Sequence, residues 1–88
     1  MTNPNTLKRH AALVDRMSQK LGIDLEEEMM RGQMQVDALG DAVLRCTGCV
    51  NADECDHWMD VHDDGAEQPP EYCRNAEVFA ALKAGRPL

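Results

Sequence analysis

The stretch that decides the fold is residues 7–21, which read LKRHAALVDRMSQKL. Its apolar side chains recur every three or four residues, and charged side chains fill the positions between them. The apolar set consists of Leu7, Ala11, Val14, Met17 and Leu21. This period predicts an amphipathic helix over about residues 5–21 that ends at Gly22, because glycine adopts the left-handed cap conformation with the least strain.

The next stretch opens with a helix start signal. Asp24 can accept hydrogen bonds from first-turn amides, and Glu27 can reach back toward it, as in a capping box. A second apolar stripe follows and predicts a long helix over about residues 25–45. Gly32 lies on this stripe, and close packing against the first helix explains a glycine there. The stripe consists of Leu25, Met29, Gly32, Val36, Leu39 and Val43.

Two shorter helices are predicted in the second half of the chain. One covers about residues 52–62 and follows a second capping-box-like start at Asn51. The other starts near Asn75 and ends at Gly85, with a proline two residues later that prevents its continuation. No alternating apolar pattern occurs in the sequence, so the expected fold class is all-α.

A chain of 88 residues is expected to form one small domain over residues 1–88. A domain of this size buries a limited fraction of its surface and often needs a metal, disulfides or a partner as a staple. We expect a helical hairpin in residues 1–45 and a half organised by a cysteine site in residues 46–88. With one Trp, one Tyr and one Phe, the composition suits helices better than strands.

The sequence offers no targeting or membrane segment. The N-terminal residues are polar without a following apolar run, unlike a secretory signal. No stretch approaches the roughly 20 apolar residues of a membrane span. We therefore expect a cytoplasmic protein without a membrane partner, where four cysteines in a short chain favour metal ligation over disulfides.

The net charge of -7 is unevenly distributed. Residues 51–77 hold nine acids and one base, Arg74, whereas residues 1–50 hold seven acids and six bases. An acidic surface repels phosphate backbones, which excludes nucleic acid as an expected partner. The acidic run surrounds the cysteines and suits docking to a basic protein patch, although solubility alone also explains such a run.

The cysteines are the one constellation with the residue types and spacing of a chemical site. They are Cys46, Cys49, Cys55 and Cys73, in the pattern C-x2-C-x5-C-x17-C. A glycine-containing turn separates the first two, and the others lie at predicted helix starts. Free amides at helix N-termini lower thiol pKa values and favour the thiolate, which is the metal ligand.

The leading interpretation is a [4Fe-4S] cluster bound by all four cysteines, with a role in electron transfer or in redox or iron sensing. The spacing differs from the bacterial ferredoxin run C-x2-C-x2-C-x3-C-P. It partly resembles the cluster loop of helical DNA glycosylases, whose last three cysteines run C-x2-C-x5-C. That loop has a further cysteine seven positions upstream, where this chain has Leu39.

The alternative is a structural zinc site with the same four ligands, in a protein-interaction module without redox chemistry. Such sites usually show two C-x2-C knuckles, and this chain has one. Thiol–disulfide chemistry is less favoured, because a redox C-x-x-C pair normally starts a helix after a strand. His57 or His62 could replace one cysteine as ligand, although an exposed His57 and a helix-ending His62 are the simpler interpretations, and His10 is expected at the surface.

The remaining residues give weaker predictions. Four methionines could form a soft partner-binding surface, in which Met30 and Met34 are partly exposed while Met29 and Met59 fill the core. We therefore expect a protein partner, bound through an acidic or methionine-containing surface, and leave the oligomeric state open. No catalytic set or phosphate-binding glycine loop is found, so we do not expect an enzyme.

Three short segments carry a resemblance: Arg45-Cys46-Thr47-Gly48-Cys49, then Cys55-Asp56-His57-Trp58, then Tyr72-Cys73-Arg74-Asn75. In these segments and over roughly residues 20–84, the chain resembles a family of small alphaproteobacterial proteins of unknown function. The resemblance rests on the four cysteines, the tryptophan and the asparagine after the last cysteine. It implies a bacterial, cytoplasmic, stand-alone protein and carries no established activity.

Overall fold

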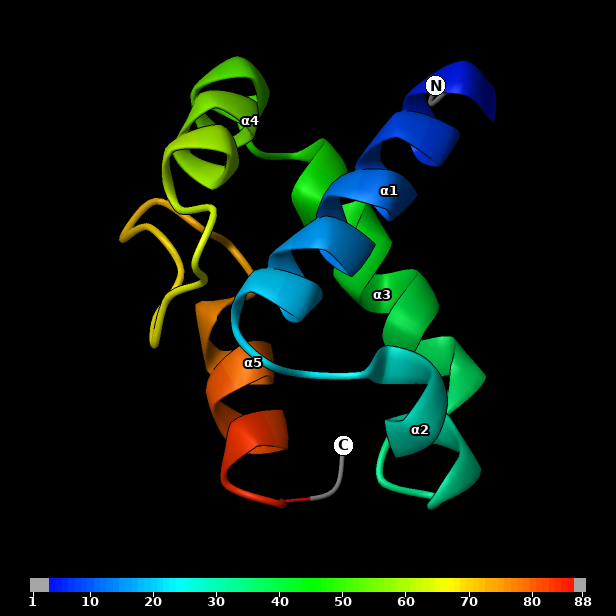
Figure 1. Ribbon diagram of the computed structural model, residues 1–88. Coiled ribbons are helices and arrows are strands. Elements are labelled where there is room, and N and C mark those ends of the chain that lie inside the picture. Colours follow the sequence, from blue (N-terminus) through cyan, green and yellow to red (C-terminus); the bar gives the residue numbers. More distant parts are fainter. Residues whose placement is uncertain (1–3, 87–88) are drawn as a thin grey trace.

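The computed structural model describes residues 4–86, and that part of the chain contains five helices and no strands (Figure 1). The all-α prediction is therefore confirmed. The helices are α1 (Pro4–Lys20), α2 (Leu25–Met30), α3 (Val36–Thr47), α4 (Ala52–Val61) and α5 (Ala76–Lys83). The long helix α1 packs against both α3 and α4 and so joins the two halves of the chain.

The expected long second helix is wrong: the chain forms α2 and α3 in its place, with residues 31–35 between them. Gly32 ends α2 with a φ of +79°, while the amides of Gly32 and Gln33 donate to Met29 and Glu28. This pair of bonds is a Schellman cap, which needs a left-handed residue. A Cβ on Gly32 would meet nothing within 4 Å. The glycine therefore serves the turn and not close packing.

The other predicted boundaries agree with the structure. Asp24 caps α2 by accepting a hydrogen bond from the Glu27 amide at 3.1 Å. Helix α4 begins one residue after Asn51, although the Asn51 side chain makes no capping bond. Helix α5 follows Asn75, and Gly85 takes a φ of +74° after its end.

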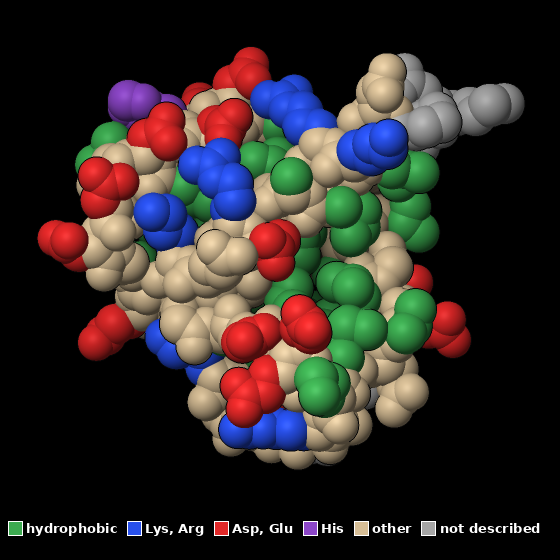
Figure 2. All heavy atoms as spheres, turned by 45° about the vertical axis from the view of Figure 1, so that its right-hand side comes forward, with side chains coloured by type: hydrophobic (Ala, Val, Ile, Leu, Met, Phe, Trp, Pro, Cys, Tyr) green, Lys and Arg blue, Asp and Glu red, His purple; other side chains and the backbone are tan. Residues whose placement is uncertain are grey.

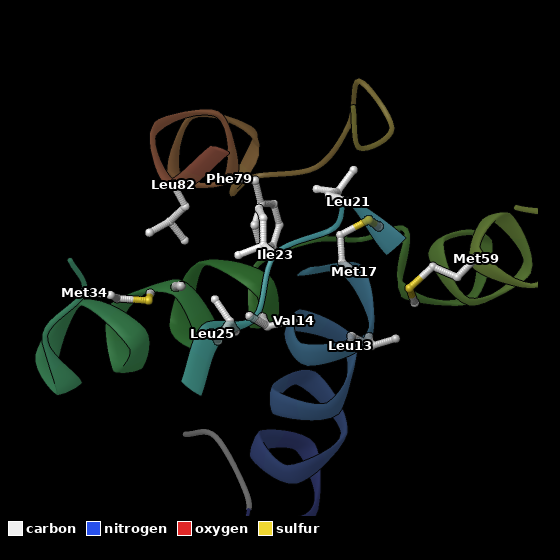
Figure 3. Close-up of a cluster of buried hydrophobic side chains, with 11 residues drawn as sticks. Leu13, Val14, Met17, Leu21, Ile23, Leu25, Met34, Met59, Phe79 and Leu82 are labelled. Atoms are coloured by element: carbon white, nitrogen blue, oxygen red, sulfur yellow. The ribbon is translucent and has the colours of Figure 1, made fainter. Parts of the chain in front are cut away.

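The core lies where α1, α3, α4 and α5 meet (Figure 3). Met59 of α4 points toward the α1 side chains, and Phe79 and Leu82 of α5 close the other side. Met34 is buried, against the expectation of partial exposure, because the turn before α3 directs it inward, whereas Met30 is exposed. The buried apolar residues are Leu13, Val14, Met17, Leu21, Ile23, Leu25, Met34, Ala42, Met59, Phe79 and Leu82.

His10 is also buried, so the prediction of a surface position is wrong. Its ring nitrogen Nδ1 lies 2.7 Å from the backbone carbonyl oxygen of Thr6, one turn earlier in α1. This local hydrogen bond satisfies the imidazole inside the packed face. Sequence spacing alone treated His10 as one polar position among many, since it could not show which helices cover α1.

The segment after α4 is tied to the end of α1. The Ala66 amide donates to the Lys20 carbonyl at 2.8 Å. Gly65 has a φ of +92°, and a Cβ there would lie 2.9 Å from the same carbonyl oxygen. Only glycine fits this approach without a shift of the backbone. The tether sets the course of the chain from α4 toward Cys73.

Over residues 4–86, no helix combines the length and the apolar character needed to cross a bilayer.

Candidate metal centre

The four cysteines come from three segments of the fold. Cys46 lies in the last turn of α3, Cys49 follows that helix, Cys55 lies in the first turns of α4, and Cys73 precedes α5. All four are half-buried, and all four are free thiols. Their positions at helix ends agree with the expectation from the sequence.

The thiols lie within range of one another's charge. In each of the six possible pairs, ionisation of one thiol raises the pKa of the other: Cys46 with each of the other three, Cys55 with Cys49 and Cys73, and Cys73 with Cys49. They are nevertheless not gathered around one point. Among residues 4–86, no three Cys, His, Asp or Glu side chains are arranged to hold a metal ion.

Backbone amides point at two of the sulfurs. The Asn51 amide donates to Sγ of Cys49 at 3.4 Å, in the turn closed by the Cys49 amide and the Cys46 carbonyl at 3.0 Å. Burial raises the pKa of Cys73, and a backbone hydrogen bond from Asn75 opposes that shift. N–H donors of this kind stabilise thiolates and tune the metal centres that thiolates bind.

The expectation that helix-start amides lower the thiol pKa values is wrong for Cys55 and Cys73, because burial is the largest influence on both and raises their pKa values. Burial raises the pKa of Cys46 to about 11, and the charges of the other three cysteines add to it. Burial likewise raises the pKa of Cys55 to about 11, with contributions from Cys73, Cys49 and the carboxylate of Asp56. The raised pKa values of Cys46, Cys55 and Cys73 favour the protonated thiol at these positions unless a cationic centre compensates the charge of the thiolates.

Two arginines of α1 form ion pairs with carboxylates of α4, the helix that contains Cys55. Arg9 pairs with Asp53 at 2.6 Å, and Arg16 pairs with Asp56 and, at 3.3 Å, with Asp60. Arg9 lowers the pKa of Cys46, although less than burial raises it. These contacts between α1 and α4 neutralise part of the acidic run, which the sequence presented as one continuous negative segment.

Two residues beside Cys73 also belong to the site. The guanidinium of Arg74 lies over the turn between Cys46 and Cys49, since a Cβ on Gly48 would lie 3.5 Å from its Cζ and Nε atoms. Tyr72 is half-buried, and its pKa is raised by burial and then by Cys55, Glu54 and other thiolates. Sequence reasoning assigned neither residue a role, and adjacency to Cys73 is the signal that marks both.

The histidines near the site differ in their surroundings. His57 is exposed. His62 is half-buried, with Nδ1 2.8 Å from the Trp58 carbonyl oxygen, and its ring stacks on Trp58 at a centroid distance of 4.0 Å. These two rings and Tyr72 line a hollow of about 640 Å³ on the outer side of α4. His62 thus shapes a surface beside the cysteines.

The donor set can be compared with the needs of a metal group. Tetrahedral zinc requires Zn–S distances of about 2.3 Å, which brings four sulfurs close together. A [4Fe-4S] core places an iron between each cysteine sulfur and the centre, so its ligands stand further apart. Four half-buried thiols, two of them receiving backbone N–H donors, have the chemistry that either group needs. Among residues 4–86 no three of them are arranged around one point, so either group would have to draw them together.

A family model described as "Family of unknown function (DUF6455)" matches residues 1–85. No curated protein and no solved structure matches the chain. Because the matched range covers nearly the whole chain, the protein belongs to the DUF6455 family.

Proposed function

We propose that this DUF6455 protein binds a [4Fe-4S] cluster through Cys46, Cys49, Cys55 and Cys73 and serves in electron transfer or in redox or iron sensing. A bound cluster of this type would supply one-electron chemistry beside the ends of α3, α4 and α5. The chain's part is to supply thiolates, to donate backbone hydrogen bonds to sulfur, and to shield the centre from water.

The support for the proposal is a set of four free, half-buried thiols that lie in or beside the ends of α3, α4 and α5. They lie within range of one another's charge, although they are not gathered around one point. In each of the six pairs of thiols, the charge of one raises the pKa of the other. The backbone amides directed at Cys49 and Cys73 favour the thiolate form, which is the metal ligand, because a protonated thiol gains little from an N–H donor.

The surroundings suit a centre that exchanges electrons with another protein. The thiols are half-buried, so a bound group lies near the surface. The hollow lined by Trp58, His62 and Tyr72 offers an adjoining apolar and aromatic face. Asp56 opposes negative charge at Cys55, and carboxylates of this kind make reduction of the centre harder.

A zinc-stapled interaction module without redox chemistry is the second candidate. The turn at Cys46 and Cys49, with an N–H donor to the second sulfur, is the local geometry that favours it. Binding of zinc, like binding of a cluster, would have to draw the cysteines together, because no three metal-binding side chains of residues 4–86 are arranged for one ion.

The test is the content of iron, zinc and acid-labile sulfide in anaerobically purified protein, together with its absorption spectrum. The Cys55→Ser variant removes one proposed ligand, and His57→Ala is the matched control, two residues away on the same helix and exposed. We expect several irons per chain with equal sulfide in the wild type and the control, and their loss in the serine variant.

Other results decide against the proposal. About one zinc per chain without sulfide would replace it with the structural zinc site. A folded protein that binds neither iron nor zinc after anaerobic reconstitution would remove both candidates. Full retention of iron in Cys55→Ser would show that the ligand set is wrong.

A further inference from the structure

An apolar groove runs along the face of the molecule formed by α1, α2 and α3, and it contains none of the four cysteines. It consists of two adjoining hollows of about 490 and 900 Å³. Ala11 of α1 and Val43 of α3 line both hollows, so the two form one continuous depression. Any ligand of this groove is therefore independent of the candidate metal centre.

The groove gathers exposed apolar side chains. Met30, Val36 and Leu44 are 81%, 70% and 55% exposed, and each lines one of the two hollows. In the space-filling view, apolar side chains form a strip down this face, with carboxylates beside it (Figure 2). Exposed apolar surface that is contiguous and bordered by polar groups is typical of interaction sites.

The border of the groove is acidic. Glu26, Asp37 and Asp41 line it and form no ion pair with any of residues 4–86. Asp15 adds a fourth carboxylate, and Lys8 is the one basic side chain in the lining. An occupant with an apolar face and cationic flanks would match both features of the groove.

We propose that this groove binds an amphipathic helix of a partner protein, with an apolar stripe directed into the groove and lysines or arginines beside the stripe. Charge complementarity favours this occupant over a second copy of the chain. Two copies joined through this face would bring two sets of unpaired carboxylates together, and like charges across an interface are repulsive. A basic helix relieves that repulsion and buries the exposed methionine, valine and leucine.

The dimensions of the groove suit a short helix. Its α1 wall extends from Leu7 to Asp15 and its α3 wall from Val36 to Leu44. Eight residues of helix correspond to a rise of about 12 Å, or roughly two turns. The matching ligand therefore has apolar anchors at positions i, i+3 or i+4, and i+7, the usual pattern of helix-in-groove recognition. A flexible methionine at one end allows the groove to adapt to different anchors.

The probe for the test is a fluorescent synthetic helix of about 14 leucines and lysines, with leucines at the i, i+3, i+4, i+7 spacing. A peptide of the same composition in scrambled order is the reference. Fluorescence anisotropy measures binding to the wild-type protein and to the double variant Val36→Glu/Leu44→Glu. Val61→Glu is the matched control, because Val61 is 65% exposed and lies outside the groove.

We expect the patterned peptide to bind more tightly than the scrambled one. The double glutamate variant should weaken that binding roughly tenfold or more, and the Val61 control should leave it unchanged. A second variant, Asp37→Asn/Asp41→Asn, should weaken binding by roughly threefold and reduce its dependence on salt. Asp37 and Asp41 are exposed, so their replacement by asparagine should leave the fold intact. This variant therefore still tests the proposal if the double glutamate variant fails to fold.

Three results overturn the proposal. Equal binding of the patterned and scrambled peptides would mean attraction by net charge alone. A wild-type protein that sediments as a dimer, and becomes monomeric in Val36→Glu/Leu44→Glu, would assign the groove to self-association. Absence of binding by the patterned peptide at low salt would show that the groove does not accept a basic helix.

Discussion

Replacement of Gly65 by alanine tests how the segment after α4 is held. Gly65 combines a φ of +92° with a close approach, since a Cβ would lie 2.9 Å from the Lys20 carbonyl oxygen. That oxygen accepts the hydrogen bond from the Ala66 amide at 2.8 Å. An added methyl group therefore meets the atom that fixes this segment to the end of α1.

The cost has two parts. A left-handed conformation costs an alanine roughly 1–2 kcal/mol. The contact with a backbone oxygen requires the segment to move, which weakens a hydrogen bond worth about 0.5–1.5 kcal/mol net. We therefore expect Gly65→Ala to lower the free energy of unfolding by about 2–3 kcal/mol, a large share of the stability of a small domain.

Gly85→Ala is the matched control. Gly85 also has a positive φ, of +74°, but a Cβ there would meet nothing within 4 Å. Gly85→Ala should therefore lower the free energy of unfolding by the conformational cost alone, about 1–2 kcal/mol. Urea unfolding of both variants, followed by circular dichroism with the metal content held equal, separates the conformational strain from the close approach.

Equal destabilisation by the two substitutions would refute the reasoning, because it would leave no cost for the approach to Lys20. A Gly65→Ala protein as stable as the wild type would refute the left-handed conformation as well. A consistent secondary result would be lower metal content in Gly65→Ala than in Gly85→Ala, since the tethered segment leads to Cys73.

Three further predictions concern the core and the thiols. Met59→Ala should cost about 2–5 kcal/mol in urea unfolding, because the side chain is fully buried, and an effect under 1 kcal/mol would show a loosely packed α4. Asn75→Ala should cost about 1–2 kcal/mol, because its amide donates to the Ala42 carbonyl at 2.8 Å inside the core; an unchanged unfolding midpoint would argue against that bond. In metal-free, reduced protein the free energy of unfolding should fall as pH rises from about 9 to 11, because unfolded thiols ionise near 9.0 while the pKa values of Cys46 and Cys55 are raised to about 11, and the Cys46→Ser/Cys55→Ser variant should lack that part of the decline.

Several structural features followed from local sequence signals. The apolar period of α1, the Asp24 cap and the glycine after α5 were each predictable, because a helix and its ends depend on neighbouring residues. Gly32 shows the limit of this reasoning. It occupied a position compatible with both a packed helix and a left-handed cap, and the structure contains the cap.

The candidate site also combines features that the sequence predicted with features that only the fold reveals. Its four cysteines were found by residue type and spacing, which need no fold. The ion pairs of Arg9 and Arg16 with α4, and the approach of Arg74 to Gly48, join residues distant in sequence. No local pattern predicts such pairs, because they depend on how α1 packs against α4 and on how the segment before α5 lies against the end of α3.

The sequence by itself determined the all-helical class, most helix ends and the identity of the thiols, since these follow from periodicity, capping and composition. The tertiary structure alone decided that His10 and Met34 are buried, that the acidic run is partly neutralised, and that an apolar groove remains open beside α3. The physical reason is that burial and ion pairs form between two elements that pack together, and not within one element. Both therefore depend on which helix faces the tertiary structure brings into contact.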